Sequence, residues 1–167
     1  GWKGGIGTAS RICTCREGTF TVGVLVMTNT GDSRELRIGE SHVGRHLLPP
    51  GQVERLPSPG SIIMVVATEA PLTSRQLGRI VSRAPLGLAR SGGTADHNSG
   101  DFVIGFSNSA LPPIMADEHL TPLMRGAIEA TEEAVINSVL RSETIVGRDN
   151  NIRHGIPIDD VRSLLKG

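Results

Sequence analysis

The sequence predicts an α+β protein in which a small β-sheet carries amphipathic helices. Three apolar segments, rich in β-branched residues, have the length and composition of strands; they span residues 19–27, 62–68 and 102–107. Two further segments repeat apolar residues at helical spacing, and these begin at Thr73 and Thr121. The 21 glycines and 10 prolines predict many turns, as expected of a sheet-rich chain.

The amino-acid composition argues against two classes of binding partner, nucleic acids and membrane surfaces. The 167 residues are enough for one domain with a hydrophobic core. Lys and Arg together number 17, as do Asp and Glu, and aromatic residues make up only 2%. This balance gives no support for a nucleic acid or a membrane surface as partner. No apolar run approaches the ~20 residues that span a bilayer.

The central strand begins at a peptide bond suited to self-cleavage. The unbroken apolar run 62–68 predicts a strand buried on both faces, and Ser61 stands where a proline-rich loop enters it. Gly60 tolerates strained backbone angles, and the Ser61 hydroxyl can attack the carbonyl just before it. The freed serine would carry its own base, because an α-amino group has a pKa of about 7.7–8.0. The alternative is an ordinary loop that enters an ordinary strand.

A polar loop supplies further candidates. Residues 91–101 are small or polar and connect a helix to a strand, which is a typical place for a functional site. Ser99 and Asp101 are close enough in sequence to reach a common point. Asp96 and His97 also allow a Ser–His–Asp arrangement with Ser99 or with the serine that begins the central strand.

Other patterns favour structural roles. Asn29 ends a strand, where its carboxamide can either point into a site or form a turn. Cys13 and Cys15 share a strand face, and His42 and His46 are four residues apart, but neither pair completes a metal-binding pattern. We therefore expect no metal and no cofactor.

Helix signals are clear in the second half of the chain. Thr73 and Gln76 have the spacing of a capping box, and Pro85 should divide that helix near Arg83. The helix that begins at Thr121 has a face of small residues, which we expect either to pack closely or to contact another subunit. A turn is predicted at Asp149-Asn150-Asn151, and a short closing helix over residues 158–166.

Taken together, several ordered blocks resemble one family, the L-aminopeptidase/D-esterase (DmpA-like) family, which includes the β-peptidyl aminopeptidases and is peptidase family S58. The resemblance covers nearly the whole chain. The blocks are Gly4–Ser10, Thr21–Val26 with Asn29 after it, Gly60–Ile63, Ala67–Leu72, Leu86–Arg90, and Ser99–Asp101 leading to Phe106 and Ser107.

The resemblance implies a self-processing serine aminopeptidase that also acts on amides and esters. It implies cleavage between Gly60 and Ser61, so that Ser61 becomes the amino-terminal nucleophile and Asn29 an oxyanion-hole donor. Ser99 and Asp101 match the serine and acidic residue that contact the nucleophile and its amine. Asp101 is one methylene shorter than the Glu of some members, so it would reach the amine through water.

The resemblance also implies a four-layer αββα sandwich like that of the amino-terminal nucleophile hydrolases. Family precursors are about twice as long as this chain, so we expect a C-terminal portion: residues 1–60 would end the first subunit, residues 61–167 would form the second, and both would belong to one structural domain. Much of the first subunit, including substrate-pocket residues, would lie upstream. We expect a short peptide, amide or ester substrate, a homo-oligomer of processed pairs, and a cytoplasmic location, with the periplasm as the alternative.

Two other functions stay open. One is an acyltransferase of the ornithine acetyltransferase kind, although that class uses threonine as its nucleophile. The other is an inert assembly subunit of the same fold. Glu69 is the only candidate that we can name for binding the substrate's ammonium group.

Overall fold

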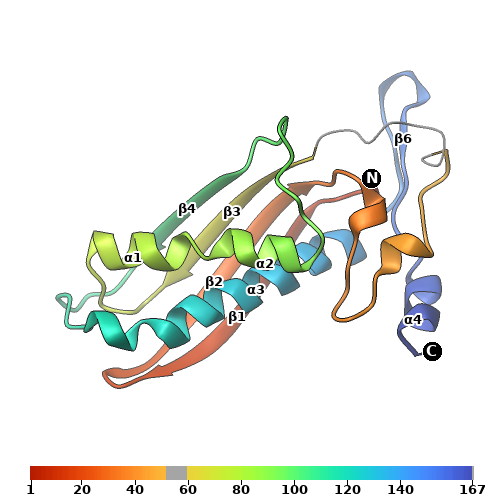
Figure 1. Ribbon diagram of the computed structural model, residues 1–167. Helices are drawn as coiled ribbons and strands as arrows, with labels where there is room; N and C mark the ends of the chain where they lie inside the picture. The colour runs from red at the N-terminus through yellow and green to blue at the C-terminus, as the bar shows by residue number, and fades with distance from the viewer. Residues whose placement is uncertain (52–59, 167) are drawn as a thin grey trace.

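The computed structural model describes residues 1–51 and 60–166, and its centre is a four-stranded sheet (Figure 1). The strand order follows the chain: β1 (Ile6–Cys15), β2 (Gly18–Asn29), β3 (Ser61–Thr68) and β4 (Phe102–Ser107). β2 is antiparallel to both β1 and β3, whereas β3 and β4 are parallel. The parallel pair requires a crossover, and the helices between β3 and β4 provide it.

Three helices cover one face of this sheet (Figure 1). They are α1 (Ser74–Val81), α2 (Ala84–Arg90) and α3 (Thr121–Leu140). The capping box at the start of α1 is present as predicted, and Pro85 lies in the first turn of α2, directly after the break between the two helices. The prediction that proline divides this segment is therefore confirmed.

The long helix α3 packs closely on the first two strands. Ala127, Ala130 and Ala134 are fully buried in the main core, so our suggestion that this small-residue face contacts another subunit is wrong. Gly7 on β1 explains how near the backbones come. A Cβ added there would lie 1.9 Å from the carbonyl oxygen of Ala134, so no larger residue fits without a shift.

The opposite face of the sheet is open. β3 alternates buried and half-buried residues, so the prediction of burial on both faces is wrong for the described chain. The outward residues are nevertheless apolar; Ile6 is 63% exposed, Phe102 64% and Ile104 58%. The described residues thus form one helix layer and one sheet layer, with an apolar sheet surface that a further layer would cover.

A second, smaller core lies at the end of the sheet where β3 begins. The short 3₁₀ turn η2 (Val43–Arg45) contributes to it, as does the closing helix α4 (Ile158–Lys166), which was predicted. A second 3₁₀ turn, η1 (Ser33–Glu35), lies beside it, where the Ser33 hydroxyl accepts a hydrogen bond from the Trp2 amide. The buried residues of this core are Trp2, Val43, Val139, Ile156 and Val161. This core holds the segment after β2 beside the start of β3.

A small hairpin was not predicted. β5 (Ile145–Val146) pairs with β6 (Ile152–Arg153) and stands away from the body (Figure 1). The predicted turn lies between these strands, where Asp149 and Asn150 both adopt positive φ. Two such central residues are typical of the turns that close tight hairpins. In the described ranges 1–51 and 60–166, no helix is both long enough and apolar enough to cross a membrane.

Candidate active site

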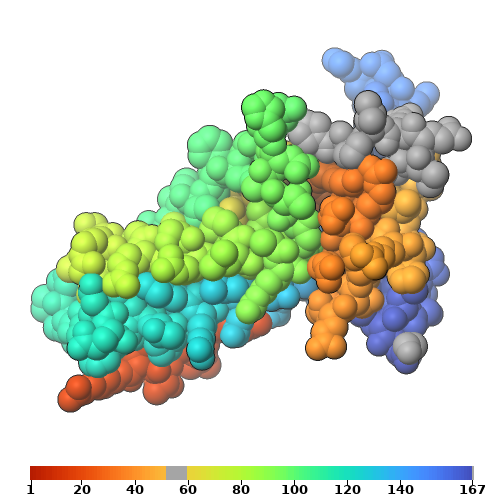
Figure 2. All heavy atoms as spheres, viewed as in Figure 1, coloured from red at the N-terminus to blue at the C-terminus, as the bar shows by residue number. Residues whose placement is uncertain are grey.

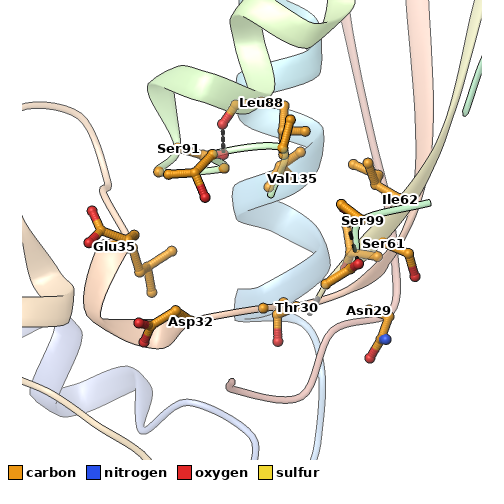
Figure 3. Close-up of a pocket in the computed structure, with 18 of the residues that line it drawn as sticks. Asn29, Thr30, Asp32, Glu35, Ser61, Ile62, Leu88, Ser91, Ser99 and Val135 are labelled. Carbon is orange, nitrogen blue, oxygen red and sulfur yellow. Dashed lines mark hydrogen bonds between the residues drawn. The ribbon is translucent and has the colours of Figure 1, made fainter. Parts of the chain in front are cut away.

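The first residue of β3 lies opposite the last residue of β2. Ser61 and Asn29 are Cα partners in the antiparallel pairing of these strands. Paired residues share a sheet face, so both side chains leave the open face, whereas Ile62 points into the core. The structure therefore brings together the residues that the sequence suggested as nucleophile and oxyanion donor, and Figure 3 shows them side by side.

The polar loop before β4 reaches the same point. The Ser99 hydroxyl lies 3.1 Å from the carbonyl oxygen of Gly60 and 2.6 Å from Oδ1 of Asp101. Gly60 supplies the carbonyl group of the peptide bond that would be cut. All five sequence-predicted residues, namely Asn29, Gly60, Ser61, Ser99 and Asp101, therefore lie together.

The Ser99 hydroxyl has two acceptors but only one proton to donate. The hydroxyl therefore donates to one of them at a time, and its contact with the Asp101 carboxyl is the shorter. A group at position 101 that donated to Ser99 would leave the Ser99 proton for the Gly60 carbonyl oxygen.

Gly60 is required by close packing. We expected glycine here for its backbone freedom, but among the glycines that the structure describes only Gly18, Gly39, Gly51 and Gly92 have positive φ. A Cβ at position 60 would instead lie 2.8 Å from the amide nitrogen of Gly31 and 3.0 Å from the carbonyl oxygen of Asn29. The backbone at the end of β2 and just after it therefore packs closely against Gly60, at the Gly60–Ser61 bond.

The loop that carries Ser99 is anchored on residues that precede Gly60 in the chain. Gly92 has a φ of +97°, and a Cβ there would lie 1.8 Å from the carbonyl oxygen of Glu35. The Arg37 amide donates to the carbonyl oxygen of Ser91 at 3.0 Å. In Figure 2 this loop, in green, lies directly beside the orange segment that contains Glu35. The position of Ser99 consequently depends on both sides of the proposed cut.

A cavity extends from these residues toward the helix layer (Figure 3). It has a volume of about 780 Å³, which includes its open mouth. Gly60, Ser61 and Ser99 line one end, and Glu35 lines the other. Apolar side chains form most of the wall between them: Trp2, Leu36, Ile62, Leu88, Val135 and Val139.

The charged residues that line this cavity are all acidic, namely Asp32, Glu35, Asp96 and Asp101. Burial would raise the pKa of Asp32, but hydrogen bonds from Arg34 outweigh this and hold the pKa below its usual value. Asp32 is therefore ionised at neutral pH, and its charge is paired with the Arg34 guanidinium.

Other candidates lie elsewhere. His97 is exposed and does not line the cavity, so the structure does not bring it to Ser61. Glu69 follows the far end of β3, roughly 26 Å along an eight-residue strand, and accepts a hydrogen bond from the Thr21 amide. It cannot bind an ammonium group at Ser61, so this suggestion is wrong.

In each of the cysteine and histidine pairs, one residue makes a packing contact or a hydrogen bond within the fold. Cys13 packs against Gly126, and Nε2 of His42 contacts the carbonyl oxygen of Arg34 at 2.9 Å. Within the part of the chain that the structure describes, no three His, Cys, Asp or Glu residues cluster in a way that would hold a metal ion.

The cavity wall was not predicted. Leu88 and Val135 repeat at helical spacing with residues of the core, and the same pattern describes both locations. Only the placement of α2 and α3 around the loop shows that they line a cavity.

Comparisons with known proteins identify the family of this chain. The model of peptidase family S58 matches residues 1–153. The β-peptidyl aminopeptidase BapA of Sphingosinicella xenopeptidilytica is 39% identical over 99% of this chain, and that of Sphingosinicella microcystinivorans is 34% identical over the same share. The matched regions make up 47% and 48% of those proteins, so this chain spans about half their length.

Two solved structures resemble this chain in fold. The L-aminopeptidase D-Ala-esterase/amidase of Ochrobactrum anthropi, described as a serine aminopeptidase and a variant of the Ntn hydrolase fold, matches with a TM-score of 0.85 and 34% identity. A β-aminopeptidase from a Burkholderia species matches with a TM-score of 0.82 and 34% identity. Each match covers 99% of this chain and 48% or 49% of the other. The predicted fold class is therefore confirmed.

Proposed function

This chain belongs to peptidase family S58, and we propose that it is the C-terminal half of a self-processing serine aminopeptidase that also hydrolyses amides and esters. The observation that carries the proposal is the position of the Ser99 hydroxyl, 3.1 Å from the carbonyl oxygen of a Gly–Ser peptide at the start of a central strand. A hydrogen-bond donor at this atom is what attack on that carbonyl requires.

Self-cleavage would begin with the intact Gly60–Ser61 bond. Ser61 Oγ attacks the Gly60 carbonyl carbon, and Ser99 donates to the carbonyl oxygen as negative charge develops there. The C–N bond breaks as the nitrogen takes up the hydroxyl proton, which leaves an ester between Gly60 and Ser61. Water hydrolyses this ester to a Gly60 carboxylate and a free Ser61 with its amino group.

In substrate turnover the same serine would act again. The Ser61 amine takes the proton of Oγ, which attacks the scissile carbonyl of the substrate, and then returns the proton to the leaving amine. The Asn29 carboxamide, which leaves the same sheet face, donates to the oxyanion. Once the new Gly60 carboxylate moves away from Ser61, the Ser99 hydroxyl and Asp101 can hold the new amine in position.

The two products would remain one folded unit. The proposed cut divides the chain into residues 1–60 and 61–167, yet β2 pairs with β3 along eight residue pairs across it. Helix α3, from the second product, also packs on β1 and β2 of the first. Shared sheet and core therefore hold the products together.

The names of the relatives guide the proposed substrates. Two are β-peptidyl aminopeptidases, and one acts as an L-aminopeptidase and D-Ala-esterase/amidase. We propose a short peptide, amide or ester with a free amino-terminal residue as substrate. We also propose a homo-oligomer of processed pairs, to be tested by light scattering on the eluted protein.

The direct test is hydrolysis by the natural full-length protein. Release of p-nitroaniline from alanyl and β-alanyl p-nitroanilides, and its loss in Ser61→Ala, would support the proposal. Transfer of acetyl from acetylornithine to glutamate would instead indicate an acyltransferase. A folded protein with neither activity would indicate an inert assembly subunit.

A further inference from the structure

We propose that two hydroxyl groups, those of Thr30 and Ser33, position the peptide bond for self-cleavage. Both form hydrogen bonds with the backbone of Trp2, and together they fix Gly31, which packs against the bond to be cut. The inference rests on the proposed self-cleavage. Neither hydroxyl is a catalytic group in it, because each acts through the backbone that it holds.

The contact at the scissile bond is between two backbones. A Cβ on Gly60 would lie 2.8 Å from the amide nitrogen of Gly31 and 3.1 Å from its Cα. Gly31 therefore limits how far the Gly60 carbonyl group can move on this side. A misplacement of about 1 Å can slow a reaction by ~10²-fold, so the groups that hold Gly31 affect the rate of cleavage.

Two hydrogen bonds hold the chain on either side of Gly31. The Thr30 hydroxyl donates to the carbonyl oxygen of Trp2, and the Ser33 hydroxyl accepts from the Trp2 amide at 2.7 Å. Ser33 is buried, and a hydrogen bond shielded from water is stronger than an exposed one. Figure 3 shows Thr30 beside Asn29, the proposed oxyanion donor.

Trp2 is a firm anchor for these two bonds. Its side chain is 4% exposed. It packs in the second core with Val43, Val139, Ile156 and Val161. The backbone around it is also closely packed, since a Cβ on Gly1 would lie 2.1 Å from the Gly31 carbonyl oxygen, and one on Gly4 would lie 2.5 Å from that of Thr28. Trp2 thereby links the scissile bond to helices α3 and α4.

The test makes one substitution at two places in the full-length protein. Thr30→Val removes the hydroxyl that bonds to Trp2, and self-cleavage should slow about 10-fold or more. Thr30→Ser keeps a hydroxyl and should be cut at nearly the wild-type rate. Ser33→Ala, which leaves the Trp2 amide without its acceptor, should also be cut slowly.

Thr68→Val is the matched control for a general loss of stability. Thr68 is 4% exposed, and its hydroxyl donates to the carbonyl oxygen of Thr21 at 2.7 Å, at the other end of β3 from Ser61. Both valine variants should unfold at lower urea concentration than the wild type. Only Thr30→Val should be cut slowly.

A measurement without cleavage separates this inference from the proposed function. Amide hydrogen exchange is followed by mass spectrometry in the Ser61→Ala background. Peptides that cover residues 28–33 and 60–64 should exchange faster when Thr30→Val is added, and at the same rate when Thr68→Val is added. Faster exchange would show that Thr30 holds the two segments together, and an uncut wild-type protein would then count against the proposed function alone.

Two results would overturn the positioning role. One is unchanged exchange of both peptides in Ser61→Ala/Thr30→Val. The other is a rate of self-cleavage that Thr30→Val leaves at the wild-type value, or that Thr68→Val lowers equally.

Discussion

The Ser99 hydroxyl lies 3.1 Å from the carbonyl oxygen of Gly60 and 2.6 Å from a carboxylate oxygen of Asp101. One side chain therefore joins the bond to be cut to the acid beside it. Ser99→Ala should slow self-cleavage by ~10²–10³, because it removes one donor to the developing oxyanion. The fraction of cleaved chain, followed over time on a denaturing gel, measures this loss.

Asp101→Asn should keep self-cleavage and impair turnover. An amide at position 101 can donate to Ser99, which leaves the Ser99 proton for the Gly60 carbonyl oxygen, but a neutral amide holds the new ammonium group less firmly. Cleavage on gels and kcat/KM for alanyl p-nitroanilide separate the two effects. Asp101→Ala is the control: it removes the side chain that positions the Ser99 hydroxyl, so both steps should slow. An uncut Asp101→Asn beside a cut Asp101→Ala would contradict this role.

Gly60→Ala should slow self-cleavage by roughly 10²-fold, because the added methyl group would meet Gly31 and Asn29 backbone atoms and displace the scissile carbonyl. Time courses of cleavage give the rate. The matched control is Gly78→Ala, since a Cβ at the exposed Gly78 meets nothing within 4 Å. Wild-type cleavage in Gly60→Ala would show that close packing does not position this bond.

Gly7→Ala should lower the free energy of unfolding by ~1–3 kcal/mol, because helix α3 must move away from β1 to admit the methyl group. Gly78→Ala, inside helix α1, should raise it by up to ~1 kcal/mol. Urea unfolding measures both changes, and opposite signs are the expected result. An unaffected Gly7→Ala would mean that α3 does not pack at the distance described.

Asp117→Asn tests an ion pair that fastens α1 to the segment before α3. Hydrogen bonds from Arg75 and Gln76 lower the pKa of Asp117 to about 2. A lowered pKa means that the interaction stabilises the fold fully above the unfolded pKa of about 3.9 and is lost as the pH falls through about 2. The stability difference between wild type and Asp117→Asn should therefore be constant from pH 7 to about 5 and shrink below pH 4. A difference that persists at pH 2 would contradict this.

Local signals predicted the elements well. The capping box at Thr73, the break at Pro85 and the turn at Asp149 each depend on neighbouring residues, and all three are present. The apolar run after Ser61 also predicted a strand, but its burial on both faces was wrong for the described residues, in which every second residue of β3 is only half-buried.

The geometry of the site could not be predicted from local sequence, because it depends on the tertiary fold. Asn29 and Ser61 are 32 positions apart, and only the register of β2 against β3 makes them partners. The reason for glycine at position 60 likewise lies in the backbone of Gly31, which no local pattern reveals. Leu88 and Val135 have the same sequence pattern as core residues, so their place in a cavity wall follows from tertiary packing alone.

The central claim is that the Gly60–Ser61 bond is cut by Ser61 itself. The most direct measurement is the intact mass of the purified full-length protein, with amino-terminal sequencing of each chain, beside the Ser61→Ala variant. The account predicts a wild-type fragment that begins Ser61-Ile62-Ile63 and a single uncut chain for Ser61→Ala. An uncut wild-type protein, or a Ser61→Ala variant cut at the same bond, would contradict it.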